Sequence, residues 1–357
     1  MKPKVFIVTI FCLISAFSLL TVYPNASAFS LRWLPPTSPS HFQAEEIKIL
    51  KKVGEIGEKF GEGEEDYFWH IDDLCCDDEG NLYVADSGWN KIFKFSPEGK
   101  FLGSFGREGQ GPGEFMGQPR RLPLSISYGN DGHLYVFDSG NQRIAKFTLE
   151  GNYLDQIFPR FFTYDDSLVA NSKGELIVIA KQGEFTLAVY NEQGELVKTI
   201  LPRKEFYRYR FSPEPPGFPR TIIHLKLRKA FSRKDHLYVV SNLSLEIFQF
   251  DEDFNLVNKF KIKNSRFEND FKKSLKEAVS KGRYRTAFHE LLVDDKENLY
   301  LFYFNSSFNC EEMYQFSPNG QFKNIMLLPE ETLGTYALYQ DKIFGCIDNH
   351  KIGIYLK

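Results

Sequence analysis

Cysteine is scarce in this sequence, with five among 357 residues. Five cysteines are too few to hold a chain of this length together through disulfides, so the fold must rest on a hydrophobic core. Cys75 and Cys76 are neighbours on an expected strand, where adjacent side chains point to opposite faces, so at most one of them can meet a given partner. The sequence does not decide which disulfides, if any, form among Cys75, Cys76, Cys310 and Cys346. An equally good interpretation is that these cysteines are free thiols, buried as small apolar side chains.

Basic residues are not in excess. The chain has 44 Lys and Arg against 47 Asp and Glu, a formal net charge of −3. If residues 1–28 are removed, Lys2 and Lys4 leave with them, and 42 basic residues remain against 47 acidic ones. A protein that binds nucleic acid needs a basic face to engage phosphates, so this balance argues against nucleic acid as a partner.

Motifs of nucleophilic hydrolases are also missing. The sequence contains no G-x-S-x-G nucleophile elbow, and it suggests no Ser-His-Asp or Cys-His arrangement. One glycine-rich stretch, Gly109–Gly113, resembles a phosphate loop, but such a loop needs a strand before it and a helix after it. Here Pro112 removes a backbone donor and a strand is expected to follow, so the sequence favours a loop between structural units.

Long uncharged apolar runs are missing except at the N-terminus. Two lysines precede the run Val5–Leu20, and the small residues Ala26–Ala28 follow it. This pattern is typical of a secretory signal peptide, so we predict that residues 1–28 are cleaved after Ala28 and that the protein is secreted, periplasmic or in the cell envelope. An uncleaved run could instead anchor the chain in a membrane, and no span is expected after cleavage. Residues 29–45, rich in Pro and Ser, are expected to form a linker.

Aromatic residues, by contrast, are plentiful at 16% of the chain, so the apolar area for a core is ample. The clearest pattern is the stretch Gly80–Phe95, which recurs almost unchanged at Gly132–Phe147, 52 residues later. Each copy holds a short apolar run bounded by turn residues, then a tight polar turn and an alternating run. This order is typical of a buried strand and its hairpin partner, and its recurrence predicts a repeat architecture.

The repeat can be followed to the end of the chain. Six units of four expected strands succeed one another, except that the sixth unit lacks its fourth strand. The N-terminal strand Ile47–Gly57 matches the last strand of a unit. We therefore predict an all-β fold, a six-bladed β-propeller over residues 46–357, in which the N-terminal strand completes the sixth blade and closes the ring.

Two insertions interrupt the period. Residues 203–220 alternate aromatic and basic residues and then contain four prolines. Residues 263–282 are predicted to form a short helix, because Ser265 and Glu268 make a capping box and an apolar stripe with a spacing of four residues follows. A helix with one apolar stripe must pack on something, and we expect it at one mouth of the ring.

The two clearest repeats carry a resemblance. The sequences GNLYVADSGWNKIFKFSPEGKFL at 80–102 and GREGQGPGEF at 106–115 resemble the NHL-repeat class of six-bladed propellers. They are more similar still to exported bacterial six-bladed propeller proteins that carry a GxGPGEF linker. The resemblance is specific in the first two blades and weaker in the others. It implies a propeller fold and a binding role, because NHL propellers serve mainly as recognition platforms.

The polar turns of these repeats are expected to be structural. They contain Asp86, Ser87 and Asn90 in the first blade and the matching Asp138 in the second. Asp and Asn side chains in such turns usually bond to nearby backbone groups.

The first strand of each propeller blade lines the central channel, and the residues before it lie at one mouth. Asp73, Asp166 and Glu290 occupy such positions and could hold Ca²⁺. The resemblance adds that six-bladed enzymes of the paraoxonase and gluconolactonase sort do this, and that amidating-lyase relatives hold Zn²⁺, for which His70, His224 and His289 are available. The simplest interpretation is a solvated mouth of mixed charge with no cofactor.

Two classes of function stay open. The favoured one is an exported, non-catalytic and monomeric propeller that binds a protein, peptide or glycan at one mouth. Aromatic and basic side chains could grip such a partner by stacking and cation–π contact, although residues 206–211 could equally be a plain strand. The alternative is a metal-dependent propeller hydrolase or lyase. The predicted binding residues are Tyr207, Arg208, Tyr209, Arg210, Arg121, Arg228 and His289.

Overall fold

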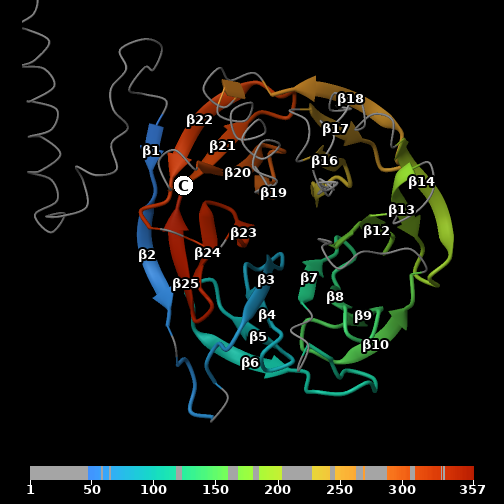
Figure 1. The fold of residues 1–357 in the computed structure, drawn as a ribbon, viewed down its shortest axis with the longest axis vertical. Helices are drawn as coiled ribbons and strands as arrows, with labels where there is room; N and C mark the ends of the chain where they lie inside the picture. Colours follow the sequence, from blue (N-terminus) through green and yellow to red (C-terminus); the bar gives the residue numbers. More distant parts are fainter. Residues whose placement is uncertain are drawn as a thin grey trace, which may run out of the picture. The chain divides into compact units, whose positions relative to one another are not determined.

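Twenty-five strands are described in the computed structural model, and they form six sheets (Figure 1). Residues 44–357 form one unit, separate from residues 1–43. The structure describes residues 47–57, 59–63, 66–117, 123–159, 168–179, 185–202, 227–241, 246–262, 268–269, 288–305, 310–330, 332 and 334–357.

Each sheet is one blade, and its strands follow one another from the centre of the ring outward. Blade one contains β3 (Ile71–Cys76), β4 (Leu82–Asp86), β5 (Lys91–Phe95) and β6 (Phe101–Phe105). Blade two contains β7 (Leu124–Tyr128), β8 (Leu134–Asp138), β9 (Arg143–Phe147) and β10 (Tyr153–Ile157). Blade three contains β11 (Val169–Ala170), β12 (Leu176–Ile179), β13 (Phe185–Tyr190) and β14 (Leu196–Pro202).

The second half of the chain continues the same plan. Blade four contains β15 (Leu227–Phe231), β16 (Leu237–Ser241), β17 (Glu246–Phe250) and β18 (Leu256–Lys261). Blade five contains β19 (Phe288–Val293), β20 (Leu299–Asn305), β21 (Cys310–Phe316) and β22 (Phe322–Leu327), joined by β1 (Ile47–Ile49). Blade six contains β23 (Tyr336–Tyr339), β24 (Lys342–Asp348) and β25 (Lys351–Leu356), completed by β2 (Lys51–Ile56).

The recurring Gly-Asn-Leu-Tyr sequence is explained by hydrogen bonds to an aspartate in the turn before it. Asp77 closes the turn between β3 and β4, where its Oδ1 accepts from the Asn81 amide at 2.8 Å and its Oδ2 from the Tyr83 hydroxyl at 3.0 Å. Blade five repeats the arrangement, with Asp294 accepting from the Tyr300 hydroxyl at 2.8 Å. The tyrosine therefore packs its ring in the core while its hydroxyl has a partner, which a buried polar group needs.

The hydrophobic core lies between neighbouring blades. The described residues form six core clusters, and each joins side chains from two adjacent sheets. The innermost strands β3, β7, β11, β15, β19 and β23 also contact one another in that order around the ring, and β23 returns to β3. This arrangement confirms the predicted six-bladed propeller, because a blade with two apolar faces is buried only by a neighbour on each side.

Ring closure by the N-terminal strand is also confirmed, with a refinement. β2 pairs antiparallel with β25 and becomes the outer strand of blade six, whereas β1 pairs parallel with β22 on the outer edge of blade five. Leu50, between the two strands, donates its amide to the Leu327 carbonyl at 2.9 Å. One continuous segment therefore fastens two blades, which the repeat pattern did not indicate.

Parts of the sequence interpretation lie outside the described residues. They are the signal peptide and linker (1–45), the insertion 203–220 and most of the insertion 263–282, of which only residues 268–269 are described, as helical. In the part that is described, no helix has both the length and the apolar character to cross a membrane. Cys75, Cys76 and Cys346 are free thiols.

Candidate functional site

A cavity of about 480 Å³ runs along the central channel, and all six innermost strands contribute to its wall. Its size is within the usual range for small-ligand pockets. The lining is predominantly acidic, because its carboxylates outnumber its basic groups. The charged residues of the lining are Asp73, Asp78, Glu290, Asp294 and Asp295, opposed by Lys229 and Arg233.

Glu290, on β19, presents a carboxylate of this lining that accepts a single hydrogen bond among the described residues. One oxygen accepts from the Leu291 amide at 3.0 Å, and within the described residues the other has no hydrogen-bond partner. Burial raises the pKa of Glu290, the positive charge of Arg228 opposes this rise, and the Asp73 carboxylate adds to it, with a net value of about 7. Glu290 can therefore change its protonation state near neutral pH and has an oxygen left for a ligand.

Asp73, on β3, is in a different situation. Its Oδ2 accepts from the Ser125 hydroxyl at 2.6 Å and from the Ile126 amide at 3.0 Å, and its Oδ1 accepts from the Leu74 amide at 2.9 Å. Burial raises the pKa of Asp73, and these hydrogen bonds counteract the rise. The carboxylate thus ties the inner strand of blade one to that of blade two.

The structure places two of the predicted site residues, Asp73 and Glu290, in the lining of the cavity, and a third, Arg228, close enough for its charge to act on them. The charge of Arg228 lowers the pKa of both carboxylates, which places its guanidinium in their neighbourhood. His289 lies next to Glu290 on β19, but its side chain is outside the described part. The remaining predicted site residues, Arg121, Asp166 and Tyr207, Arg208, Tyr209 and Arg210, are outside it as well.

The metal hypothesis can be compared with the described side chains. Among them, no group of three or more His, Cys, Asp and Glu is arranged to hold a metal ion. Of the predicted carboxylate set, Asp73 already has three donors, Glu290 has one donor among the described residues, and Asp166 is not described. The carboxylate metal site therefore stays a prediction.

One end of the channel is crossed by Arg233. We call this end the hairpin mouth, because the turns between the first and second strands of the blades surround it. Arg233 of blade four pairs with Asp78 of blade one (Nη1–Oδ1 2.6 Å) and approaches Asp295 of blade five (Nε–Oδ1 3.8 Å). Its guanidinium carbon lies 5.5 Å from the ring centre of Tyr128 in blade two, and the Tyr128 hydroxyl donates to Asp78 at 2.8 Å.

Further contacts join the turns of blades two, three and four at the same mouth. Asn130 donates its side-chain amide to Asp235 at 2.6 Å and to the Ser232 carbonyl at 2.8 Å, and Ser172 donates its backbone amide to Asp235 at 3.0 Å. Sequence reasoning missed this network, because each member alone is typical of a solvated turn. Glu290 lies near the start of β19, toward the opposite end of the channel, which we call the strand-start mouth because the innermost strands begin there.

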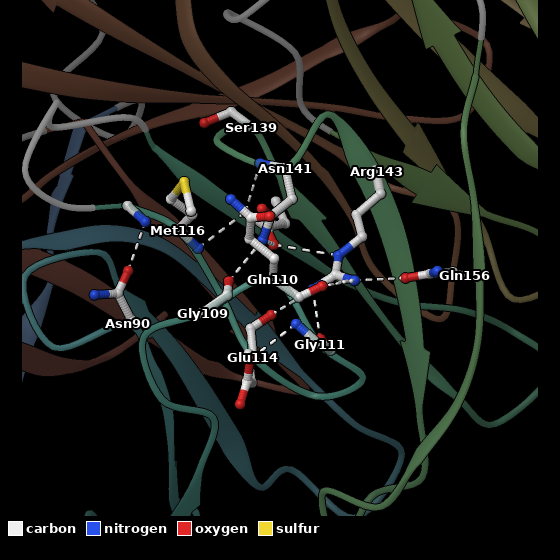
Figure 2. Close-up of polar contacts among 12 residues, drawn as sticks. Asn90, Gly109, Gln110, Gly111, Glu114, Met116, Ser139, Asn141, Arg143 and Gln156 are labelled. Carbon is white, nitrogen blue, oxygen red and sulfur yellow. Dashed lines mark hydrogen bonds and ion pairs between the residues drawn. The ribbon is translucent and has the colours of Figure 1, made fainter.

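The glycine-rich linker between blades one and two is held by a buried arginine (Figure 2). Arg143, only 2% exposed, points into the loop and donates to the carbonyls of Gln110 (3.1 Å), Gly111 (2.8 Å) and Glu114 (2.7 Å). It also pairs with Asp138 at 3.3 Å and donates to the Gln156 side chain at 2.6 Å. The loop is thus an inter-blade connection whose carbonyls face the guanidinium of Arg143.

The polar turns are structural, as predicted. Asp86 is fully buried and accepts from the amides of Trp69 (2.8 Å), His70 (3.1 Å) and Trp89 (3.1 Å). Asn90 likewise accepts from the Gly117 amide at 2.5 Å, on the next linker. These turns therefore hold the segments that connect neighbouring blades.

Comparison with known proteins agrees with the fold. The chain is 33% identical over 146 residues to peptidyl-glycine alpha-amidating monooxygenase A of Xenopus laevis, a match that covers 36% of this chain and 15% of that protein. The chain thus spans a small part of that relative's length.

Two solved structures from Bacteroides are similar in fold. A Bacteroides fragilis protein named as an exported protein aligns with a TM-score of 0.53 and 11% identity, over 87% of this chain and 95% of its own. A member of the duf4221 family from Bacteroides vulgatus aligns with a TM-score of 0.54 and 10% identity, over 86% and 97%. At such identities the likeness concerns the fold alone.

The family comparison covers more of the sequence. Residues 64–315 match the family DUF5128, described as a 6-bladed beta-propeller. This range extends from the linker before β3 into β21, and thus over most of the described ring. The chain therefore belongs to this family of six-bladed β-propellers.

Proposed function

We propose that the protein is an exported, non-catalytic binding module that takes a positively charged ligand group, such as the amino terminus of a peptide, into its central channel. The observation that carries this proposal is the Glu290 carboxylate, one oxygen of which has no hydrogen-bond partner among the described residues, in a cavity lined by all six blades. The binding role that the NHL resemblance implies supports the same interpretation.

The charge of the cavity selects the class of ligand. Its carboxylates outnumber its cations, so an ammonium group gains Coulomb attraction where a carboxylate group would be repelled. Asp78 and Asp295 face Arg233 at the hairpin mouth, Asp294 accepts from the Tyr300 hydroxyl, and Asp73 is satisfied by blade two. Glu290 is then the group to which the ligand cation would bind, and a bound cation would lower the pKa of Glu290 from its raised value.

Binding calorimetry with paired peptides tests this proposal. The probes are a pool of tetrapeptides without Lys or Arg that have a free amino terminus, and the same pool after N-acetylation. We expect binding of the free-amine pool only, and Glu290→Gln should weaken it about tenfold, since a charge-assisted hydrogen bond is lost. Asp155→Asn, an exposed acid on β10, is the matched control. Equal binding of both pools, or an unchanged affinity in the Glu290 variant, would contradict the proposal.

A metal-dependent hydrolase or lyase is the second candidate. Two observations favour it, namely a channel carboxylate with a free oxygen and the partial identity to an amidating monooxygenase. Glu290, Asp166 and Asp73 would hold Ca²⁺, or histidines including His289 would hold Zn²⁺, and the ion would polarise a bound oxygen.

Elemental analysis of the purified protein, with melting curves before and after chelation, separates the two candidates. About one equivalent of metal and a lower melting temperature after chelation would favour the enzyme, because a ligand that binds only the native state stabilises it. Absence of both effects would leave the binding module.

A further inference from the structure

The structure shows a second surface that the channel does not explain, an exposed aromatic cluster of Tyr67, Trp69 and Trp89. Trp69 is 49% exposed and Tyr67 is exposed as well. The ring centroids of Trp69 and Trp89 lie 5.1 Å apart, and those of Tyr67 and Trp89 lie 5.0 Å apart, both in edge-to-face geometry. Large aromatic side chains that remain at the surface of a protein rich in buried aromatics indicate an interaction site.

The cluster is rigid before any partner arrives. The buried carboxylate of Asp86 accepts from the backbone amides of both Trp69 and Trp89, so one side chain fixes both tryptophans. The Trp89 indole N–H donates to the Tyr67 carbonyl at 3.0 Å, which fixes the orientation of its ring. Trp69 packs so closely on Gly88 that an added Cβ would lie 2.6 Å from its ring. Preorganised aromatic groups lose little entropy on binding.

The segment that leads into the cluster gives the charge of the expected partner. Its described charged residues are Glu62 and Asp66 against the single basic residue Lys59. Asp66 immediately precedes Tyr67, and its carboxylate accepts from the Gly63 amide at 2.7 Å. Aromatic faces beside carboxylates attract ammonium and guanidinium groups, through the ring quadrupole and through Coulomb attraction.

We infer that Tyr67, Trp69 and Trp89 form a docking site for a basic peptide segment that places a Lys or Arg side chain on the face of Trp69. The cluster precedes β3 and adjoins the turn after β4, so it lies on the face of blade one that surrounds the strand-start mouth. The inference rests on this cluster and its acidic neighbours, and not on the occupancy of the channel.

Titration with a peptide blocked at both ends tests the inference. The probe is acetyl-Gly-Arg-Gly-Arg-Gly-amide, which lacks the free amine proposed for the channel, and the readouts are calorimetry and intrinsic tryptophan fluorescence. We expect saturable binding with a change in fluorescence, and at least a fivefold loss of affinity at 0.5 M salt relative to 0.05 M, because the attraction is electrostatic.

Matched variants separate the site from a general effect. Trp69→Leu should weaken binding at least fivefold, Trp69→Phe should retain most of it, and Phe158→Ala, which removes a side chain 59% exposed elsewhere, should leave it unchanged. Glu290→Gln should also leave it unchanged, so failure here is distinguishable from failure of the channel proposal. Equal affinity in Trp69→Leu, or binding of neutral chitotetraose at these residues with no response to the Arg peptide, would overturn the inference.

Discussion

Arg233 of blade four lies 2.6 Å from Asp78 of blade one, so side chains from opposite blades of the ring meet across the hairpin mouth. Both side chains are partly exposed, and exposed ion pairs contribute little to stability. We therefore predict a coupling energy of about 1 kcal/mol or less in a double-mutant cycle of Arg233→Ala and Asp78→Ala, measured by urea unfolding. A coupling energy above about 3 kcal/mol would contradict this prediction, and it would mean that the ion pair contributes substantially to the stability of the propeller.

Arg143, unlike Arg233, is buried. Its described partners are in the linker between blades one and two or on the strands of blade two beside it. Arg143→Ala would leave the carbonyls of Gln110, Gly111 and Glu114 without their donor and Asp138 without its cation. We expect a loss of about 3–5 kcal/mol in the free energy of unfolding, measured by urea denaturation. Arg107→Ala in the same linker, which removes an exposed arginine paired with Glu114, should cost less than about 1 kcal/mol. Similar losses in the two variants would disprove this assignment.

Glu311 makes stability depend on pH. It is 3% exposed, its Oε1 has no hydrogen-bond partner among the described residues, and burial raises its pKa to about 7. Because the pKa in the folded state exceeds the ordinary value of 4.5, the folded protein binds this proton more tightly than the unfolded chain. The stabilisation is therefore complete below about pH 4.5 and is lost as the pH rises through about 7.

Glu311→Gln tests this dependence by removing the charge. Relative to the unmodified protein, the variant should be more stable by roughly 1–3 kcal/mol at pH 8 and nearly equal in stability at pH 5. The measurement is urea unfolding at both pH values, with the exposed Glu62→Gln as control. Comparison with the unmodified protein at each pH isolates this residue from Glu290, whose raised pKa acts in the same direction. A difference that does not vary with pH would contradict the assignment.

Ile56 is the residue through which the N-terminal strand closes the core. It is 2% exposed, and its cluster contains Phe93 of blade one and Ile354 of blade six. Ile56→Ala should cost about 2–5 kcal/mol, because it leaves a cavity at the junction of the first and last blades. Val53→Ala, on the same strand but 45% exposed, should change stability by less than about 0.5 kcal/mol. Thermal melting of both variants measures the contrast, and equal effects would mean that closure does not depend on this contact.

Much of the fold could be predicted from the sequence. The number of blades and the identity of their strands were readable, because each blade is a local unit with its own turn residues, such as Asp77, Asn81 and Tyr83. The deficit of one strand at the C-terminus predicted closure by the N-terminus. The sequence did not predict that the N-terminal segment is divided between two blades. The parallel pairing of β1 with β22 involves only three residues of β1, which are too few to show a periodic pattern.

The candidate site was predictable only in part. Strand position correctly placed Asp73 and Glu290 in the channel, because the first strand of every blade lines it. The sequence could not tell which carboxylate is free, since the donors that satisfy Asp73 come from Ser125 and Ile126, 52 and 53 residues away on the next blade.

The sequence by itself determined the repeat, and through it the six blades and their order around the channel. The tertiary structure decided which polar groups meet across the ring, including Arg233 with Asp78 and Asn130 with Asp235. The physical reason is the range of the interactions. A hairpin is specified by neighbours in the chain, whereas the character of a channel depends on side chains from blades far apart in sequence.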